Sequence, residues 1–221
     1  MEKRKRTLLR VLVHLLGALP LALLLVAALT GRLSYNPIQD VEQRLGRAAL
    51  YFLVASLAIT PLITLTGWNL LQPPRRTLGL YAFLYASLHF LTFALVDYGL
   101  DLGEISRLVV EKPYILAGFT AGLILLPLAV TSLDQLKRKM GKNWKTLHRM
   151  VYLASLAVIL HFAWARKGSL ATLSGDITTP LLWGLLVVVL LLMRLPAVRR
   201  WLSQRRQSVI ASLQRKRSAQ P

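Results

Sequence analysis

Four histidines are the strong nitrogen ligands of this 221-residue chain, which contains no cysteine: His14, His89, His148 and His161. Without cysteine the chain cannot form a disulfide, a cysteine-ligated iron–sulfur cluster or a thiolate metal site, so any metal chemistry must use imidazole. Two neutral imidazoles can hold the iron of a haem, and the reaction that such a centre supports is electron transfer.

Three of these histidines lie in strongly apolar segments. His89 lies near the middle of segment 78–98, and His148 and His161 lie at the two ends of segment 147–165. An ionisable side chain inside a membrane span is costly, so a functional role is the first hypothesis, and an interhelical hydrogen bond is the alternative. The 13-residue spacing corresponds to about 20 Å along a helix, so His148 and His161 are expected near opposite membrane faces, with His89 at a depth between them.

The same spacing sets a condition on the helix that carries the last two histidines. On an ideal helix, 13 residues rotate a side chain by about 220°, so the two imidazoles do not share one face. A tilt, a kink or a local bulge between them is therefore required before both can serve one electron path.

The composition indicates that these segments lie in a membrane. The chain is 55% hydrophobic and 17% charged, yet its formal charge is +19. A soluble nucleic-acid-binding protein would need more polar surface, and a disordered polycation would need lower hydrophobicity. A high apolar fraction and a large positive charge coexist when the charges lie in short loops between membrane spans. We therefore predict an integral membrane protein bound to lipid rather than to nucleic acid.

Six apolar stretches predict the fold, an all-α integral membrane protein with six transmembrane helices in a bundle. Each is close to the roughly 20 residues that cross the hydrocarbon core. The stretches are 11–30, 47–66, 78–98, 114–133, 147–165 and 177–194. The predicted organisation is a basic N-terminus (1–10), a six-helix domain (11–194) and a basic tail (195–221) that either lies on anionic lipid or is solvated.

The loop charges predict the orientation. Of the 28 Lys and Arg residues, 21 fall on the side that carries both termini, and seven of the nine acids fall on the other. The positive-inside rule therefore predicts that both termini are cytoplasmic. His148 would then lie near the cytoplasmic face and His161 near the opposite face.

Three segments carry a resemblance to a known family: LYFLVASLAITPLITLTG (50–67), RRTLGLYAFLYASLHF (75–90) and NWKTLHRMVYLASLAVILHF (143–162). They resemble the MsrQ (YedZ) family of the ferric-reductase-like transmembrane superfamily. The most specific element is W-K-x-L-H-R-x-V-Y-L-A followed by L-H-F, with its two histidines 13 residues apart. The resemblance covers most of the chain, from about Gly31 to about Arg194.

The resemblance implies a haem b-containing electron-transfer subunit in the inner membrane. Such a subunit passes electrons to a periplasmic, molybdopterin-containing methionine-sulfoxide reductase that repairs oxidised proteins. The electrons would come from a cytoplasmic flavin reductase or from quinone, and the family is also associated with FMN. The chain itself would carry electrons without performing the sulfoxide reduction.

Carried over residue by residue, the resemblance implies His89, His148 and His161 as axial haem ligands. Two haems need four ligands, so either one haem uses His89 with one of the other two, or two haems share His89. His14, outside the matching segments, could be structural, approach a quinone or flavin, or pair with His148. Haem propionates and the FMN phosphate are anionic, so we expect nearby cations to contact them. The candidates on the predicted cytoplasmic side are Arg75, Arg76, Lys145 and Arg149.

Two other functions remain open. Another b-type cytochrome or a ferric reductase would act directly on a small substrate, and a fused flavin and nicotinamide domain, which we do not recognise here, would favour it. A proton-coupled carrier would use His89 as its protonatable site, and internal repeat halves would favour it. Haem absorbance separates the carrier from the cytochromes.

Overall fold

The computed structural model describes residues 2–166 and 176–218, in which all regular structure is helical. Five segments are long and apolar enough to span a membrane, and a sixth qualifies only if α9 and α10, which are bent by 78° from each other, count as one span. The predicted all-α membrane fold is confirmed, with five spans or six. The five are α1 (Glu2–Leu29), α2 (Pro37–Thr66), α3 (Pro74–Leu91) with the π-helix η2 (Thr92–Asp97), α5 (Pro113–Val130), and α7 (Lys142–His148) with α8 (Val151–Ala165).

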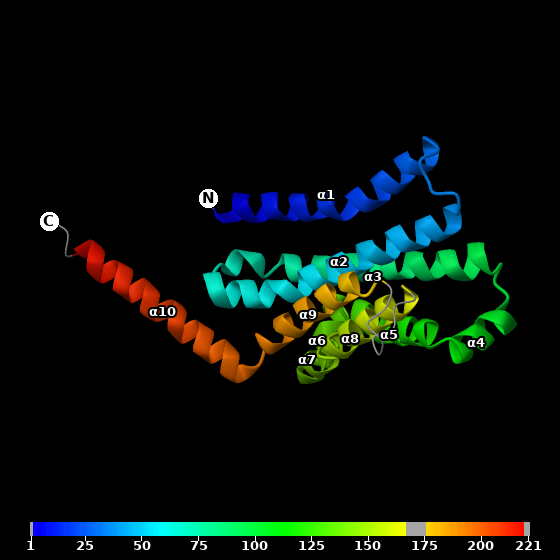
Figure 1. The fold of residues 1–221 in the computed structure, drawn as a ribbon. Coiled ribbons are helices and arrows are strands. Elements are labelled where there is room, and N and C mark those ends of the chain that lie inside the picture. The colour runs from blue at the N-terminus through cyan, green and yellow to red at the C-terminus, as the bar shows by residue number, and fades with distance from the viewer. Residues whose placement is uncertain (1, 167–175, 219–221) are drawn as a thin grey trace.

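The long helices run back and forth, which gives the bundle two ends (Figure 1). At one end α1, α3 and α8 begin and α2, α5 and α9 (Thr178–Leu192) finish. The short helices α6 (Asp134–Met140) and α7 and the C-terminal α10 (Pro196–Ser218) belong to this end, which we call the basic end. At the other, which we call the acidic end, the short α4 (Leu102–Glu111) joins η2 to α5.

The second span begins ten residues earlier than predicted. Its N-cap is Asn36, whose side-chain oxygen accepts a hydrogen bond from the Gln39 amide at 3.2 Å, and Pro37 occupies the first helical turn. The hydropathy pattern places the start at residue 47 because the first turns carry charged residues such as Asp40 and Arg44. This early start places the backbone of α2 beside the far end of α3, where it contributes to the site described below.

Two prolines interrupt the hydrogen bonding within their helices. Side chains from distant parts of the chain bond to the backbone groups there. Pro61 lacks the N–H that would bond to the Leu57 carbonyl, and Arg194 Nη2 donates to that oxygen at 2.6 Å instead. In α1, next to Pro20, the Tyr85 hydroxyl donates to the Gly17 carbonyl at 2.6 Å and accepts from the Leu21 amide at 3.3 Å. A group inserted into the helical ladder bends a helix, and α1 is visibly bent (Figure 1).

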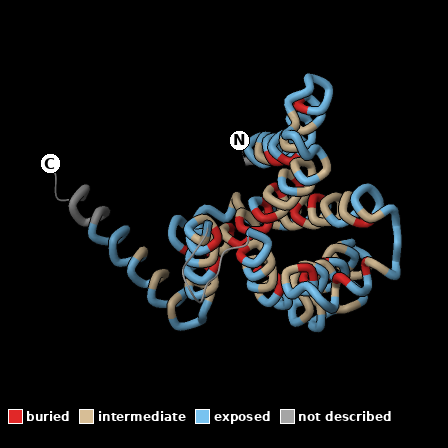
Figure 2. Tube along the Cα trace, turned by 45° about the vertical axis from the view of Figure 1, so that its right-hand side comes forward, coloured by how far each residue is buried: buried red, intermediate tan, exposed pale blue. Residues whose placement is uncertain are grey.

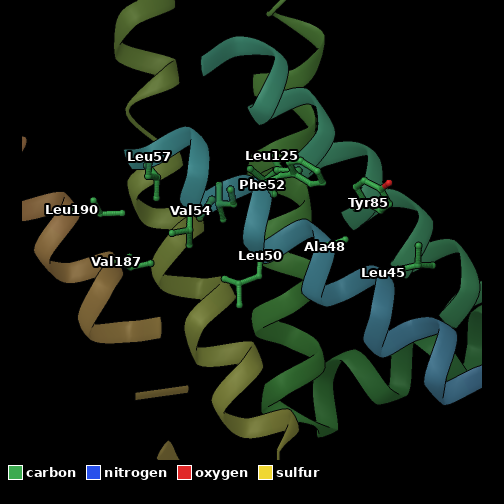
Figure 3. Close-up of a cluster of buried hydrophobic side chains, with 13 residues drawn as sticks. Leu45, Ala48, Leu50, Phe52, Val54, Leu57, Tyr85, Leu125, Val187 and Leu190 are labelled. Atoms are coloured by element: carbon green, nitrogen blue, oxygen red, sulfur yellow. The ribbon is translucent and has the colours of Figure 1, made fainter. Parts of the chain in front are cut away.

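The core forms around α2, which packs most extensively against α3 and also meets α8 and α9. The cluster shown in Figure 3 joins side chains of these helices with Leu125 of α5, among them Leu50, Phe52, Leu57, Tyr85, Val187 and Leu190. Figure 2 shows buried residues gathered between the helices and exposed ones around the outside. Many exposed residues are Leu and Val, as expected for a surface that faces lipid rather than water.

Candidate metal centre

His89 of α3 and His161 of α8 face each other inside the bundle. Their ring centroids are 5.9 Å apart and their planes are inclined at 70°. The prediction that His89 lies between the other two histidines in depth is therefore wrong. Segment 78–98 put His89 at mid-span, but α3 begins at Pro74 and its α-helical part ends at Leu91, so His89 lies near the acidic end with His161.

A backbone carbonyl fixes the orientation of each of these two rings. His89 Nδ1 lies 2.9 Å from the Glu42 carbonyl oxygen, and His161 Nδ1 lies 2.7 Å from the Tyr114 carbonyl oxygen. A carbonyl only accepts hydrogen bonds, so each Nδ1 carries the proton and each Nε2 keeps its lone pair. This tautomer, held by a hydrogen bond from the other nitrogen, is the usual arrangement of a metal-binding histidine.

The two rings lie in pockets built on the same plan. In each, a glycine follows the carbonyl residue by four positions and precedes the histidine by 43: Gly46 for His89 and Gly118 for His161. A Cβ at Gly46 would lie 3.5 Å from His89 Nδ1, an ordinary contact, but a Cβ at Gly118 would lie 2.7 Å from His161 Nδ1. From the sequence, Gly118 is part of a G-x-x-x-G with Gly122, a pattern that indicates close helix packing, and neither Gly46 nor Gly118 was assigned to a histidine. The repeated 43-residue spacing was a detectable signal.

The donor set fits a haem better than a bare metal ion. In the part of the chain that the structure describes, no three His, Cys, Asp or Glu side chains come together to hold a metal ion. A haem needs only two protein ligands, since its porphyrin supplies the others. The His89 and His161 ring centroids are 5.9 Å apart, so these two imidazoles could serve as the two protein ligands of one haem.

His148 lies apart from this pair, at the basic end. Its Nε2 is 3.1 Å from Thr131 Oγ1, and its ring stacks on Trp144 with centroids 4.0 Å apart. Trp144 in turn donates to the Thr131 carbonyl at 2.9 Å. Nε2 of His148 therefore already has a hydrogen-bond partner, unlike Nε2 of the other two rings, for which no such bond is present among the described residues.

The helix carrying His148 and His161 is interrupted, as their spacing required. Between α7 and α8 the amides of Arg149, Met150 and Tyr152 bond to carbonyls three residues back. Such 3₁₀ geometry has about 3.0 residues per turn instead of about 3.6. The extra rotation brings the two imidazoles closer to a common face than an unbroken α-helix would.

The four predicted anion-binding cations all lie at the basic end. Arg76 forms an ion pair with Asp134 at 2.7 Å, and Lys145 and Arg149 are exposed. Arg75 is half-buried and acts electrostatically on His148. Arg75 precedes His89 by 14 residues in α3, or about 21 Å of helix, so these cations are not at the His89–His161 pair.

The remaining histidine, His14, is exposed on α1. Its Nδ1 lies 2.9 Å from the Tyr81 hydroxyl. The Tyr81 ring packs against Gly17, where the side chain of any larger residue would overlap it. His14 contacts α3 rather than His148.

Comparisons with known proteins identify the family of the chain. A family model described as "Ferric reductase like transmembrane component" matches residues 45–159, which include His89 and His148 and stop two residues before His161. A relative from Herminiimonas arsenicoxydans is 42% identical over 189 residues, covering 85% of this chain and 84% of its own. One from Pectobacterium atrosepticum is 40% identical over 194 residues, covering 87% and 94%.

Both relatives bear the name "Protein-methionine-sulfoxide reductase heme-binding subunit MsrQ". A third relative of that name, from Ralstonia nicotianae, is 41% identical over 160 residues, covering 72% of this chain and 74% of its own. No solved structure matches the chain. The identities, their coverage and the family model together establish that this chain belongs to the MsrQ family of ferric-reductase-like transmembrane proteins.

Proposed function

We propose that the chain is a haem b-binding electron-transfer subunit of a protein-methionine-sulfoxide reductase system, with His89 and His161 as the two axial ligands of one haem. The observation that carries this proposal is that the two imidazoles are neighbours, with ring centroids 5.9 Å apart, each Nδ1 fixed by a carbonyl and each Nε2 available. The names of the relatives support the same ligand and the same system.

When bound, the haem supplies one-electron redox chemistry, and the protein holds its ligands in place. The Glu42 and Tyr114 carbonyls keep both rings in one tautomer and increase the basicity of Nε2. Gly46 and Gly118 let α2 and α5 approach the rings closely. Both imidazoles are half-buried between the helices, and their bonds to the two carbonyls limit how far the rings can turn.

The acidic end is the proposed exit for electrons. By the positive-inside rule it faces the periplasm, and it carries the His89–His161 pair and α4. The Arg107 guanidinium, whose Nη2 donates to Glu104 Oε1 at 2.6 Å, lowers the pKa of that half-exposed carboxyl and neutralises its charge. Asp97, Asp101 and Glu111 are exposed acids of this end that form no salt bridge within the described residues, and they could contact a periplasmic molybdopterin-containing reductase.

The basic end is the proposed entry for electrons from a cytoplasmic flavin reductase or from quinone. His148 is the proposed iron ligand of a second haem there, and it would have to release Thr131 to bind iron. Arg75, Lys145 and Arg149 are the cations that could meet its propionates or an FMN phosphate, while Arg76 would first have to leave Asp134.

Haem content of purified single variants tests the proposal. We expect His89→Ala and His161→Ala each to lose the same haem, since each removes one of its two ligands. His14→Ala, the matched control from another membrane helix, should keep full haem content. Pyridine haemochrome absorbance gives haem per chain, and the electron paramagnetic resonance spectrum reports bis-imidazole low-spin iron. Full haem retention in His89→Ala refutes the assignment, and a colourless wild-type protein would favour the carrier.

A further inference from the structure

Two half-buried arginines come together at the basic end, where α3, α8 and α9 meet. Arg194 lies two residues beyond the end of α9. Its Nη1 donates to the Tyr152 hydroxyl at 3.3 Å and its Nη2 to the Leu57 carbonyl at 2.6 Å. Its Nε is buried and has no hydrogen-bond partner among the described residues. Arg75, the second residue of α3, lies nearby: its carbonyl accepts from Ser56 Oγ at 3.0 Å, and Arg194 donates to the carbonyl of the next residue, Leu57. The two positive charges repel each other.

No carboxylate in residues 2–166 or 176–218 forms a salt bridge with either guanidinium. Asp134, the acid of the basic end whose side chain is described, pairs with Arg76, and Asp40, Glu104 and Asp176 pair with arginines elsewhere. A buried charge is costly unless an opposite charge accompanies it, and two like charges add their repulsion. This arrangement is favourable when an anion lies between the two arginines.

The surrounding groups suit an anion with several acceptor oxygens. The helix α3 begins here, and a helix N-terminus carries partial positive charge. Because the Tyr152 hydroxyl accepts from Arg194, its proton remains free to donate to a ligand. Guanidinium groups bind phosphate through two parallel hydrogen bonds, which makes phosphate the best chemical match.

The position of the site at the end of a membrane-spanning helix indicates which kind of molecule carries the phosphate. Arg194 lies just beyond the apolar α9, at the corner where α10 turns away by 78°. Arg206 of α10 contacts the end of α2, where its Nη1 donates to the Ile63 and Thr64 carbonyls at 3.3 and 3.2 Å. α10 combines seven basic residues with exposed Trp201, Val209 and Ile210, a composition typical of a helix lying on anionic lipid.

We propose that Arg75, Arg194 and the Tyr152 hydroxyl bind the headgroup phosphate of an anionic phospholipid at the corner between α9 and α10. Basic pockets between helices on the cytoplasmic side of membrane proteins are suited to such headgroups. This site uses none of the proposed iron ligands, and it assigns Arg75 to a lipid headgroup in place of the haem propionate or FMN phosphate considered above. It gives a role to the charge of Arg75, whose guanidinium forms no hydrogen bond within the described residues.

The test measures lipid binding to the delipidated full-length protein by native mass spectrometry and thermal unfolding. Phosphatidylglycerol and phosphatidylcholine of identical acyl chains are compared, with inorganic phosphate and FMN as soluble phosphates. We expect wild type to prefer phosphatidylglycerol and Arg75→Gln to reduce that preference about fivefold. Arg149→Gln, which removes an exposed cation of the same end, is the control and should change it less than about twofold.

The sign of the stability change separates this proposal from a purely structural role for Arg75. With phosphatidylcholine alone, Arg75→Gln should unfold at the same or a higher temperature than wild type, since it removes repulsion from Arg194. With phosphatidylglycerol the order should reverse, and Arg75→Lys, which keeps the charge, should lose less than Arg75→Gln. Equal losses in Arg75→Gln and Arg149→Gln overturn the proposal. Millimolar phosphate or FMN displacing the lipid from wild type would show a soluble ligand and overturn the lipid assignment.

Discussion

Replacing Gly118 by alanine tests the histidine pocket most directly. The new Cβ would lie 2.7 Å from His161 Nδ1 and 2.9 Å from Cε1, whereas ordinary contacts begin at 3.4 Å. The ring would have to retreat by about 0.7 Å, but its Nδ1 is bonded to the Tyr114 carbonyl at 2.7 Å. Retreat therefore breaks or distorts a hydrogen bond worth about 1 kcal/mol, and losing a bond that orients a metal ligand lowers metal affinity roughly 10–100-fold.

The assay is titration of the haem-free protein with haem, followed by the Soret absorbance. Gly122→Ala is the matched control, because it lies one turn along the same helix with no atom within 4 Å of its added Cβ. Both substitutions raise helix propensity by about 1 kcal/mol, so that effect cancels between them. Gly46→Ala, with its nearest contact at 3.5 Å, should fall close to the control. A Gly118→Ala affinity within twofold of Gly122→Ala would show that His161 is not held as described.

Two further predictions concern Tyr85 and Arg194, whose side chains bond to backbone groups near the prolines of α1 and α2. Tyr85→Phe removes the hydroxyl that joins Gly17 to Leu21, and should destabilise the protein by about 1–3 kcal/mol in unfolding experiments. Tyr81→Phe, which loses only a bond to the exposed His14, should cost less than about 1 kcal/mol, and equal costs would contradict the account. Arg194→Met should cost about 1–3 kcal/mol because the Leu57 carbonyl loses its donor. In a Pro61→Ala background the residue-61 amide can bond to that carbonyl, so Arg194→Met should destabilise the protein less. If the two substitutions change the free energy of unfolding additively, Arg194 does not compensate for the proline.

Amino-acid composition was sufficient to predict that the chain spans a membrane and that histidine must provide the ligands of any metal. A +19 charge on a chain that is 55% apolar requires basic loops between apolar spans, and the missing cysteine leaves histidine as the strong metal ligand. The sequence also showed that an unbroken helix could not align His148 with His161, and the structure has a break there. These inferences were possible because each depends on composition or on the geometry of one helix.

Only the packing of the helices shows which histidines are neighbours in space. Periodicity fixes where a residue lies along its own helix, but not how far that helix is shifted relative to its neighbours. The shift that pairs His89 with His161 depends on the early start of α2 at Pro37 and on carbonyls 47 residues before each histidine. The pairing of Arg194 with the carbonyl freed by Pro61 spans 137 residues in the same way. Contacts of this kind depend on packing between distant segments, so no local pattern in the sequence specifies them.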